Sequence, residues 1–180
     1  IGGGPSGLLL SHILYINGID SIIIERQSKN HVLSRIRAGV LEAGTVQLLR
    51  DIGLGDRMNK EGMPHDGTSI TWEGKPSLFI DVKKYTGKSF MAYGQTSITE
   101  DLYKQRELDN GQIFCEASEV NISKLRDKNP EVTFLHNGKK QTVICDYIAG
   151  CDGFHGVSRH AIPQNHQRSF QRNYPFGWLG

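Results

Sequence analysis

The residues with the clearest chemical potential open the chain as Gly2-Gly3-Gly4-Pro5-Ser6-Gly7. In a G-x-G-x-x-G turn the first glycine permits a tight turn, the second lets backbone amides approach a pyrophosphate, and the third lets a helix pack closely on a strand. The N-terminus of that helix adds the positive end of its dipole. The spacing predicts that Gly2, Gly4 and Gly7 form a dinucleotide-binding turn. A loop that only reverses the chain is the alternative.

An acidic residue stands where such a site needs one. Glu25 follows Gly7 by 18 residues, at the end of an apolar run. In dinucleotide-binding folds an acid at this place accepts hydrogen bonds from a ribose hydroxyl and repels a 2′-phosphate. We therefore expect the adenosine of FAD or NAD here rather than that of NADP, and the spacing does not separate those two. The alternative is a solvated acid at a strand end.

The elements that must position these residues are readable in the first third of the chain. Apolar residues behind Pro5 predict a helix that ends at Asn17-Gly18. Ser21–Glu25 is typical of a parallel strand buried on both faces. A second helix is predicted over Ala38–Asp51, with Gly53 as its stop and with these residues facing inward: Leu41, Leu48, Leu49 and Ile52. Together these elements predict a β-turn-α-β unit.

The rest of the chain changes character toward antiparallel β-structure. The predicted elements are strands at 68–72, 77–82, 112–117, 131–136, 139–144 and 146–149, and a helix at 97–108. Asn137-Gly138 is a strong type I′ hairpin signal. The fold class expected is α/β, a Rossmann-like FAD-binding βαβ unit with an inserted antiparallel sheet. Trp72, Tyr93, Trp178 and the remaining aromatic residues are expected in the core.

Composition fits one soluble globular domain. The 180 residues are 37% hydrophobic and 22% charged, and the net charge of +2 calls for neither nucleic acid nor an anionic membrane. No apolar run approaches the roughly 18–20 residues that span a bilayer. The three cysteines lack CxxC spacing and the histidines lack ligand spacing, so we expect no metal site and a cytoplasmic location. The chain begins without Met and ends on aromatic residues, and we expect it to be truncated at both ends.

Longer blocks carry a family resemblance. They are residues 2–8, 25–27, 35–42, 93–96, 146–156 and 174–180. In this order they resemble the flavoprotein aromatic hydroxylases (the group A monooxygenases), and within that family the 4-hydroxybenzoate 3-monooxygenases. The resemblance covers a little under half of the family's full chain. It implies that residues 1–180 are a partial FAD-binding domain, in which about 68–95 begin the inserted substrate-side β region, with the rest of the substrate domain absent.

The resemblance also implies site residues, position by position. The FAD contacts it implies are Gly2, Gly4, Ser6, Gly7, Glu25, Arg35, Ile36, Arg37, Ala38, Gly39, Val40, Gln95, Asp152 and Gly153. The NADPH contacts it implies, in a surface groove, are Arg26, Gln27, His31, Arg35, Arg37 and His155. Two guanidinium groups at i and i+2 can meet phosphate oxygens bidentately. His31 stands where the best-known members carry Tyr, which leaves the preference for NADPH over NADH open. Taken singly, these arginines and His155 are more typical of solvated surface residues.

The activity implied is hydroxylation of 4-hydroxybenzoate to 3,4-dihydroxybenzoate with NADPH and O₂, by a homodimer, with the catalytic residues downstream of Gly180. Three alternatives stay open. One is a sister hydroxylase that acts on another phenolic acid. Another is a non-oxygenating NAD- or FAD-binding dehydrogenase fragment. The last is a truncated, non-catalytic product.

Overall fold

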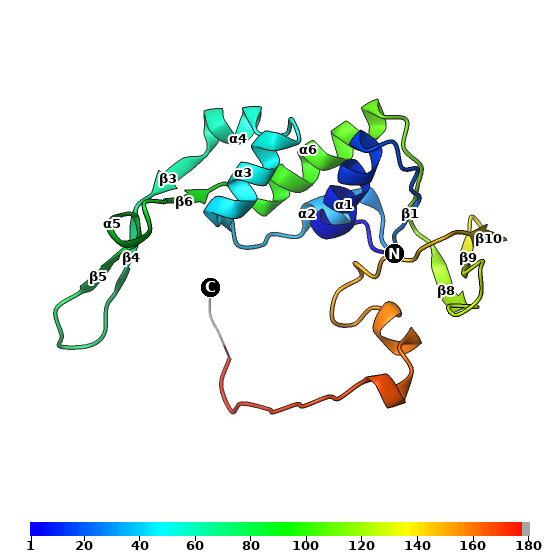
Figure 1. Ribbon diagram of the computed structural model, residues 1–180. Helices are drawn as coiled ribbons and strands as arrows, with labels where there is room; N and C mark the ends of the chain where they lie inside the picture. The colour runs from blue at the N-terminus through cyan, green and yellow to red at the C-terminus, as the bar shows by residue number, and fades with distance from the viewer. Residues whose placement is uncertain (178–180) are drawn as a thin grey trace.

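The computed structural model describes residues 1–177. The helices are α1 (Pro5–Ile16), α2 (Lys29–Ser34), α3 (Ala43–Asp51), α4 (Asp56–Glu61), α5 (Val82–Thr86), α6 (Gln95–Leu108), and the 3₁₀ helices η1 (Ser158–Ala161) and η2 (Gln164–His166). The strands are β1 (Ile23–Ile24), β2 (Val40–Leu41), β3 (Met63–His65), β4 (Gly67–Ile70), β5 (Leu78–Asp81), β6 (Phe90–Ala92), β7 (Ile113–Phe114), β8 (Ser118–Ser123), β9 (Glu131–His136) and β10 (Lys139–Ile144). None of the helices within these residues is long and apolar enough to cross a membrane. Five of the helices (α1 to α4 and α6) form one layer, with β3 to β6 at one end and β8 to β10 at the other (Figure 1).

A short parallel sheet confirms the predicted β-turn-α-β unit. β1 pairs with β7 in parallel, and the Gly2 amide donates to the Ile24 carbonyl at 2.8 Å. Ile1 lies on the other side, with its amino group donating to the Ala149 carbonyl and its carbonyl accepting from the Cys151 amide, each at 2.7 Å. The strand predicted at 146–149 is therefore wrong as a regular strand. The segment pairs here with Ile1 alone. Two hydrogen bonds, at Ala149 and Cys151, therefore form instead of a regular ladder between two strands.

The helices α1, α3 and α6 enclose the main apolar core. Its fully buried members include Leu8, Leu49, Leu102 and Tyr103. Helix α6 confirms the prediction and begins two residues earlier, at Gln95. Helix α3 turns Leu48 outward, where it is 36% exposed, so its predicted inward orientation is wrong.

The start of the second predicted helix is also wrong. The sequence favours a helix from Ala38, but Val40 and Leu41 form β2, which pairs with Ala92 and Met91 of β6. The first turn of a helix adds little stability, because several residues must be fixed before the first hydrogen bond forms. Pairing with a distant strand satisfies the same backbone groups, although the Val40 side chain stays 65% exposed. Helix α3 therefore begins only at Ala43.

The predicted hairpin is confirmed with its register. β9 and β10 pair from Lys139–His136 to Ile144–Glu131 across a turn in which Asn137 and Gly138 have φ of 52° and 71°. Both central residues of a type I′ turn need positive φ. β8, which was not predicted, completes a three-stranded antiparallel sheet. A second small core of Ile24, Ala117, Val132 and Phe134 joins this sheet to β1.

The hairpin β4–β5, predicted from its Gly74 turn, extends away from the helical layer (Figure 1). Its apolar residues remain largely exposed, with Trp72 at 47% and Phe79 at 55%. The expectation that the aromatic residues lie in the core is right for Tyr93, at 6% exposed, and wrong for Trp72, Tyr147 and Phe170. Trp178 lies outside the described residues. A hairpin has two faces, and here neither face of β4–β5 packs on the main cores.

Candidate cofactor site

The glycine-rich turn (residues 2–7) joins the parallel sheet to α1 as its spacing predicts. Gly2 has φ of +106°, a region that L side chains rarely adopt, and a β-carbon there would collide with the Cys151 backbone. A β-carbon at Gly7 would collide with the Gly2 carbonyl oxygen. Helix and strand therefore approach each other through the first and third glycines of the motif.

Glu25 closes over this turn. One carboxylate oxygen accepts from the Gly3 amide at 2.6 Å and the other from the Gln27 amide at 2.7 Å. The side chain is thus fixed at the carboxyl end of β1, half-buried beside the glycines. Each carboxylate oxygen has more than one acceptor site, so both can still accept from ribose hydroxyls.

The start of α1 has the properties that a phosphate group needs. Gly4 is the N-cap of α1, and no side chain caps the helix. The first amides of a helix lack partners within the helix, and with the dipole they favour an anion. A β-carbon at Gly4 would meet nothing within 4 Å, so the space in front of these amides is open. Ser6 is exposed in the same first turn. These residues fit the pyrophosphate of a dinucleotide.

The turn after Cys151 lies against the same place. A β-carbon at Gly2 would come within 2.8 Å of the Asp152 amide. The Asp152 carboxylate accepts from the Ser158 amide at 2.9 Å, and a β-carbon at Gly156 would collide with it. Asp152 thus orders its own loop through η1, while Gly153, with φ of +72°, turns the chain. Their predicted role in binding FAD stays a prediction.

The segment from Arg35 to Val40 is brought to the start of α6. The Gly39 carbonyl accepts from the Tyr93 amide at 2.7 Å, and a β-carbon at Gly39 would lie 2.8 Å from the α-carbon of Gly94. Gly94 is the N-cap of α6, and Gln95 is its first residue. The structure therefore places the predicted contact Gln95 beside Gly39. Residues 35–38 and 40 are exposed, and Ile36 is 92% exposed.

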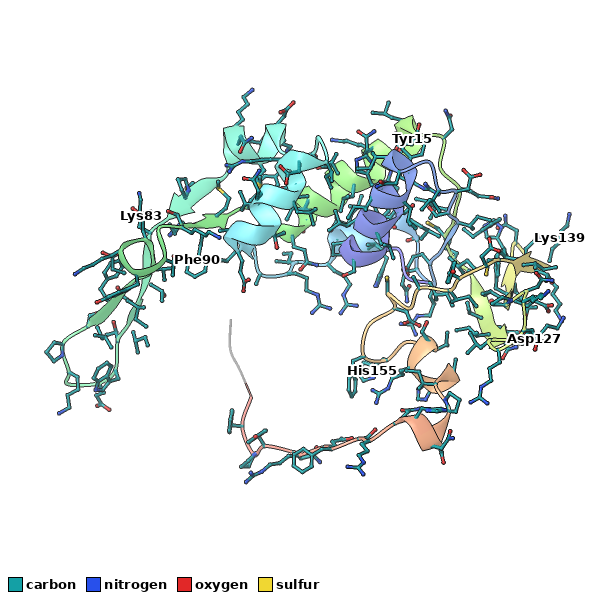
Figure 2. All side chains as sticks on the ribbon, viewed as in Figure 1. Tyr15, Lys83, Phe90, Asp127, Lys139 and His155 are labelled. Atoms are coloured by element: carbon teal, nitrogen blue, oxygen red, sulfur yellow. The ribbon has the colours of Figure 1, made fainter. Side chains whose placement is uncertain are left out.

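The residues predicted for NADPH lie in two places. Arg26, Gln27, His31, Arg35 and Arg37 surround α2, a helix that Ser28 caps by accepting from the His31 amide at 3.2 Å. His155 lies instead in the loop after Gly153, with its ring edge-on to Phe154 (Figure 2). No described contact joins His155 to the residues around α2.

A polar network supports the junction between β6 and α6. Arg57 of α4 contacts Glu61, Glu100 and Asp101, and the Tyr93 hydroxyl donates to Asp101 at 2.7 Å. Burial raises the pKa of Tyr93, so its hydroxyl remains a donor at neutral pH. The network holds the strand that precedes Gly94 and Gln95 against α4.

This network predicts an acid-side loss of stability. The Arg57 guanidinium, followed by Lys104, holds the pKa of Glu100 below its usual range. Because the pKa is depressed in the fold, the stabilisation is present above the unfolded value of about 4.3 and is lost as the pH falls through the folded pKa. Glu100→Gln should lower the free energy of unfolding at pH 7 by less than about 1 kcal/mol, since the side chain is exposed. Urea unfolding at pH 7 and pH 3 should show a smaller difference at pH 3; a difference equal at both would contradict it.

Two features of the site were not anticipated from sequence. Helix α2 was missed, although Ser28 as a capping residue was a usable signal. Tyr103 of α6 reaches the glycine-rich turn and donates to the Gly3 carbonyl at 3.0 Å. Its position on the apolar face of a helix indicated burial only, because a contact between residues 100 positions apart leaves no mark in a single sequence.

These features define a dinucleotide-binding domain, with an uncapped helix start for the pyrophosphate and an acid for the ribose. Over residues 1–180 the sequence matches the family described as "FAD binding domain". The chain belongs to this family, and the expected fold class is confirmed.

Similar proteins of known name include aromatic monooxygenases. The chain is 44% identical to the p-hydroxybenzoate hydroxylase of Acinetobacter baylyi, over all of this chain and 44% of that protein. It is 23% identical to a phenol 2-monooxygenase of a Pseudomonas species, over 85% of this chain and 28% of that protein. The p-nitrophenol 4-monooxygenase structure from Pseudomonas putida superposes with a TM-score of 0.74 at 20% identity, over 88% of this chain and 41% of that one. The chain thus spans less than half the length of these relatives.

Proposed function

We propose that the protein carrying this chain is an FAD-dependent aromatic hydroxylase that converts 4-hydroxybenzoate, NADPH, O₂ and a proton into 3,4-dihydroxybenzoate, NADP⁺ and water. The 44% identity over the whole chain to a p-hydroxybenzoate hydroxylase carries the proposed substrate. The uncapped, open start of α1 beside Glu25 supports FAD as the cofactor. Bound FAD would supply the redox chemistry, taking a hydride from NADPH and activating O₂.

The roles of this chain are to bind and to orient. In this proposal the first amides of α1 bind the pyrophosphate, Glu25 binds the adenosine ribose, and residues 35–40 with Gln95 lie along the flavin. Asp152 acts by holding its loop against Gly2. The groups that hold and deprotonate the phenol are expected downstream of Gly180.

The cationic stretch (residues 26–37) is proposed as the NADPH site. Its three arginines, Arg26, Arg35 and Arg37, are exposed and none is paired with an acid within residues 1–177, whereas Lys29 pairs with Glu107. Lysines elsewhere, such as Lys83 and Lys124, pair with acids. Unpaired guanidinium groups are free to bind phosphate bidentately. His155 is included in this proposal on the family resemblance alone.

The proposed NADPH site predicts a selective defect. Arg26→Ala should raise the KM for NADPH by roughly tenfold or more, because a hydrogen bond to a charged phosphate is worth about 1.5–3 kcal/mol. FAD content should stay close to that of the unaltered protein. Arg50→Ala is the matched control, since Arg50 is an exposed arginine whose side chain contacts Asn59. Equal KM values for the two variants would contradict the site. Comparing NADPH with NADH in His31→Tyr would show whether His31 sets the coenzyme preference.

The deciding experiment measures NADPH oxidation by the full-length, FAD-loaded protein with and without 4-hydroxybenzoate. Strong stimulation matched by 3,4-dihydroxybenzoate is expected. Stimulation only by another phenolic acid would identify a sister hydroxylase. NAD(P)H oxidation with no oxygen entering any phenol would favour a dehydrogenase, and an intact protein that binds no FAD would indicate a non-catalytic product.

A homodimer in the cytoplasm is the corresponding proposal for the whole protein. The resemblance supports the dimer, and the unpatterned cysteines Cys115, Cys145 and Cys151 support a reducing compartment. Light scattering of the full-length protein would test whether it is a homodimer.

A further inference from the structure

The glycine-rich turn is held by side chains on both sides of one residue. The Gly3 amide donates to Glu25, and the Gly3 carbonyl accepts from the Tyr103 hydroxyl at 3.0 Å. Tyr103 is 1% exposed, so this hydrogen bond is shielded from water. Two adjacent glycines have wide conformational freedom, and the peptide between Gly3 and Gly4 would otherwise rotate readily.

The direction of that peptide decides what the turn offers to a ligand. The Gly3 carbonyl and the Gly4 N–H belong to the same peptide unit, and in a planar trans peptide they point in opposite directions. The hydroxyl draws the carbonyl toward α6. The Gly4 N–H must then point away from α6. The space around Gly4 is open, since a β-carbon built on it would find nothing within 4 Å. Among the described residues no protein acceptor takes this N–H.

We infer that Tyr103 is a positioning residue for FAD: its hydroxyl orients the Gly3–Gly4 peptide so that the Gly4 amide donates to the pyrophosphate. This inference rests on the proposed FAD-dependent function. It assigns to α6 a second task beside carrying Gln95, because the same helix fixes the turn that starts α1.

The surroundings of Tyr103 keep this hydroxyl in place as a donor. The Lys29 ammonium lies 5.4 Å from the ring centroid and pairs with Glu107, so α2 covers the ring from outside. Burial, with smaller contributions from Cys115 and Glu25, raises the pKa of Tyr103. The phenol therefore stays protonated at neutral pH, and the Gly3 carbonyl can only accept from it.

Tyr103→Phe tests the inference, because it removes the hydroxyl and keeps the ring. The full-length apoprotein is titrated with FAD and followed by flavin fluorescence, and ADP is used as a competitor. We expect the Kd values for FAD and ADP to rise by roughly tenfold, the scale of one hydrogen bond to a charged group.

The matched control is Ser11→Ala. Ser11 is 3% exposed, and its hydroxyl lies 2.8 Å from that of Ser21, so the variant also loses a buried hydrogen bond on α1. A structural role alone would lower the urea stability of both variants and leave both Kd values within about twofold of the parent. That result would overturn the inference.

Two further outcomes are also decisive. If the unaltered protein itself binds no FAD, the proposed function fails along with the inference, whereas tight binding by both the parent and Tyr103→Phe overturns the inference alone. If Tyr103→Phe does not fold, Lys29→Met replaces it. This substitution removes the ammonium group that lies over the Tyr103 ring, so it loosens the ring without removing it. We expect a Kd increase of about two- to fivefold for the loss of a cation–π contact, and an unchanged Kd would overturn the inference.

Discussion

Gly4→Ala should leave the apoprotein folded and weaken FAD binding by roughly 100-fold. The backbone at Gly4, with φ of −78° and ψ of −178°, suits any residue, and the added methyl group would meet no protein atom within 4 Å. The methyl group would stand where the pyrophosphate must approach the first amides of α1. Losing one or two hydrogen bonds to a charged phosphate, at about 1.5–3 kcal/mol each, gives the expected magnitude. Fluorescence titration with FAD measures it.

Substitutions at two other glycines serve as controls for Gly4→Ala. Gly7→Ala should lose both folding stability and FAD binding, because its β-carbon would collide with the Gly2 backbone. Gly44→Ala lies in α3 in open space and should keep both properties, with stability unchanged or slightly higher. Wild-type FAD affinity in Gly4→Ala would show that the pyrophosphate binds elsewhere.

Asp109→Ala should lower the free energy of unfolding by about 3 kcal/mol, as expected when one partner of a buried pair is removed. His12 and Asp109 form this pair at 3.3 Å, and each side chain is only 6% exposed. The other ring nitrogen of His12 lies 3.0 Å from the Ile52 carbonyl, and Asp109 also accepts from Gln105 at 2.8 Å. The contacts of His12 with Ile52 and Asp109 thus join α1 to the C-terminal ends of α3 and α6. Urea unfolding measures the loss.

Lys83→Met is the control for that prediction. Lys83 and Asp66 form an ion pair whose side chains are 58% and 52% exposed, and such exposed pairs contribute little to stability. A loss in Asp109→Ala no larger than in Lys83→Met would mean that the His12 pair does not hold the helices together. FAD affinity should stay unchanged in Lys83→Met, because the pair lies on the hairpin β4–β5 side of the molecule (Figure 2).

The local patterns of this sequence determined the cofactor class and much of the framework. Gly2, Gly7 and Glu25 act through short-range geometry, since a turn, a helix start and a strand end are fixed by neighbours in the chain. The type I′ turn at Asn137-Gly138 likewise determines its own hairpin. The family blocks carried the resemblance that whole-chain identity then confirmed.

The tertiary structure decided what depends on distant partners. Val40 and Leu41 form a strand because Ala92 and Met91 of β6, more than 45 positions along the chain, pair with their backbone, which outweighs a weak local preference for helix. Trp72 and Leu48 lie outward because burial depends on which elements pack on them, and periodicity does not specify that. Tyr103 reaches Gly3 only because α6 crosses α1. The orientation of the Gly3–Gly4 peptide, on which the proposed phosphate contact depends, is a property of that crossing and could not be read from either segment alone.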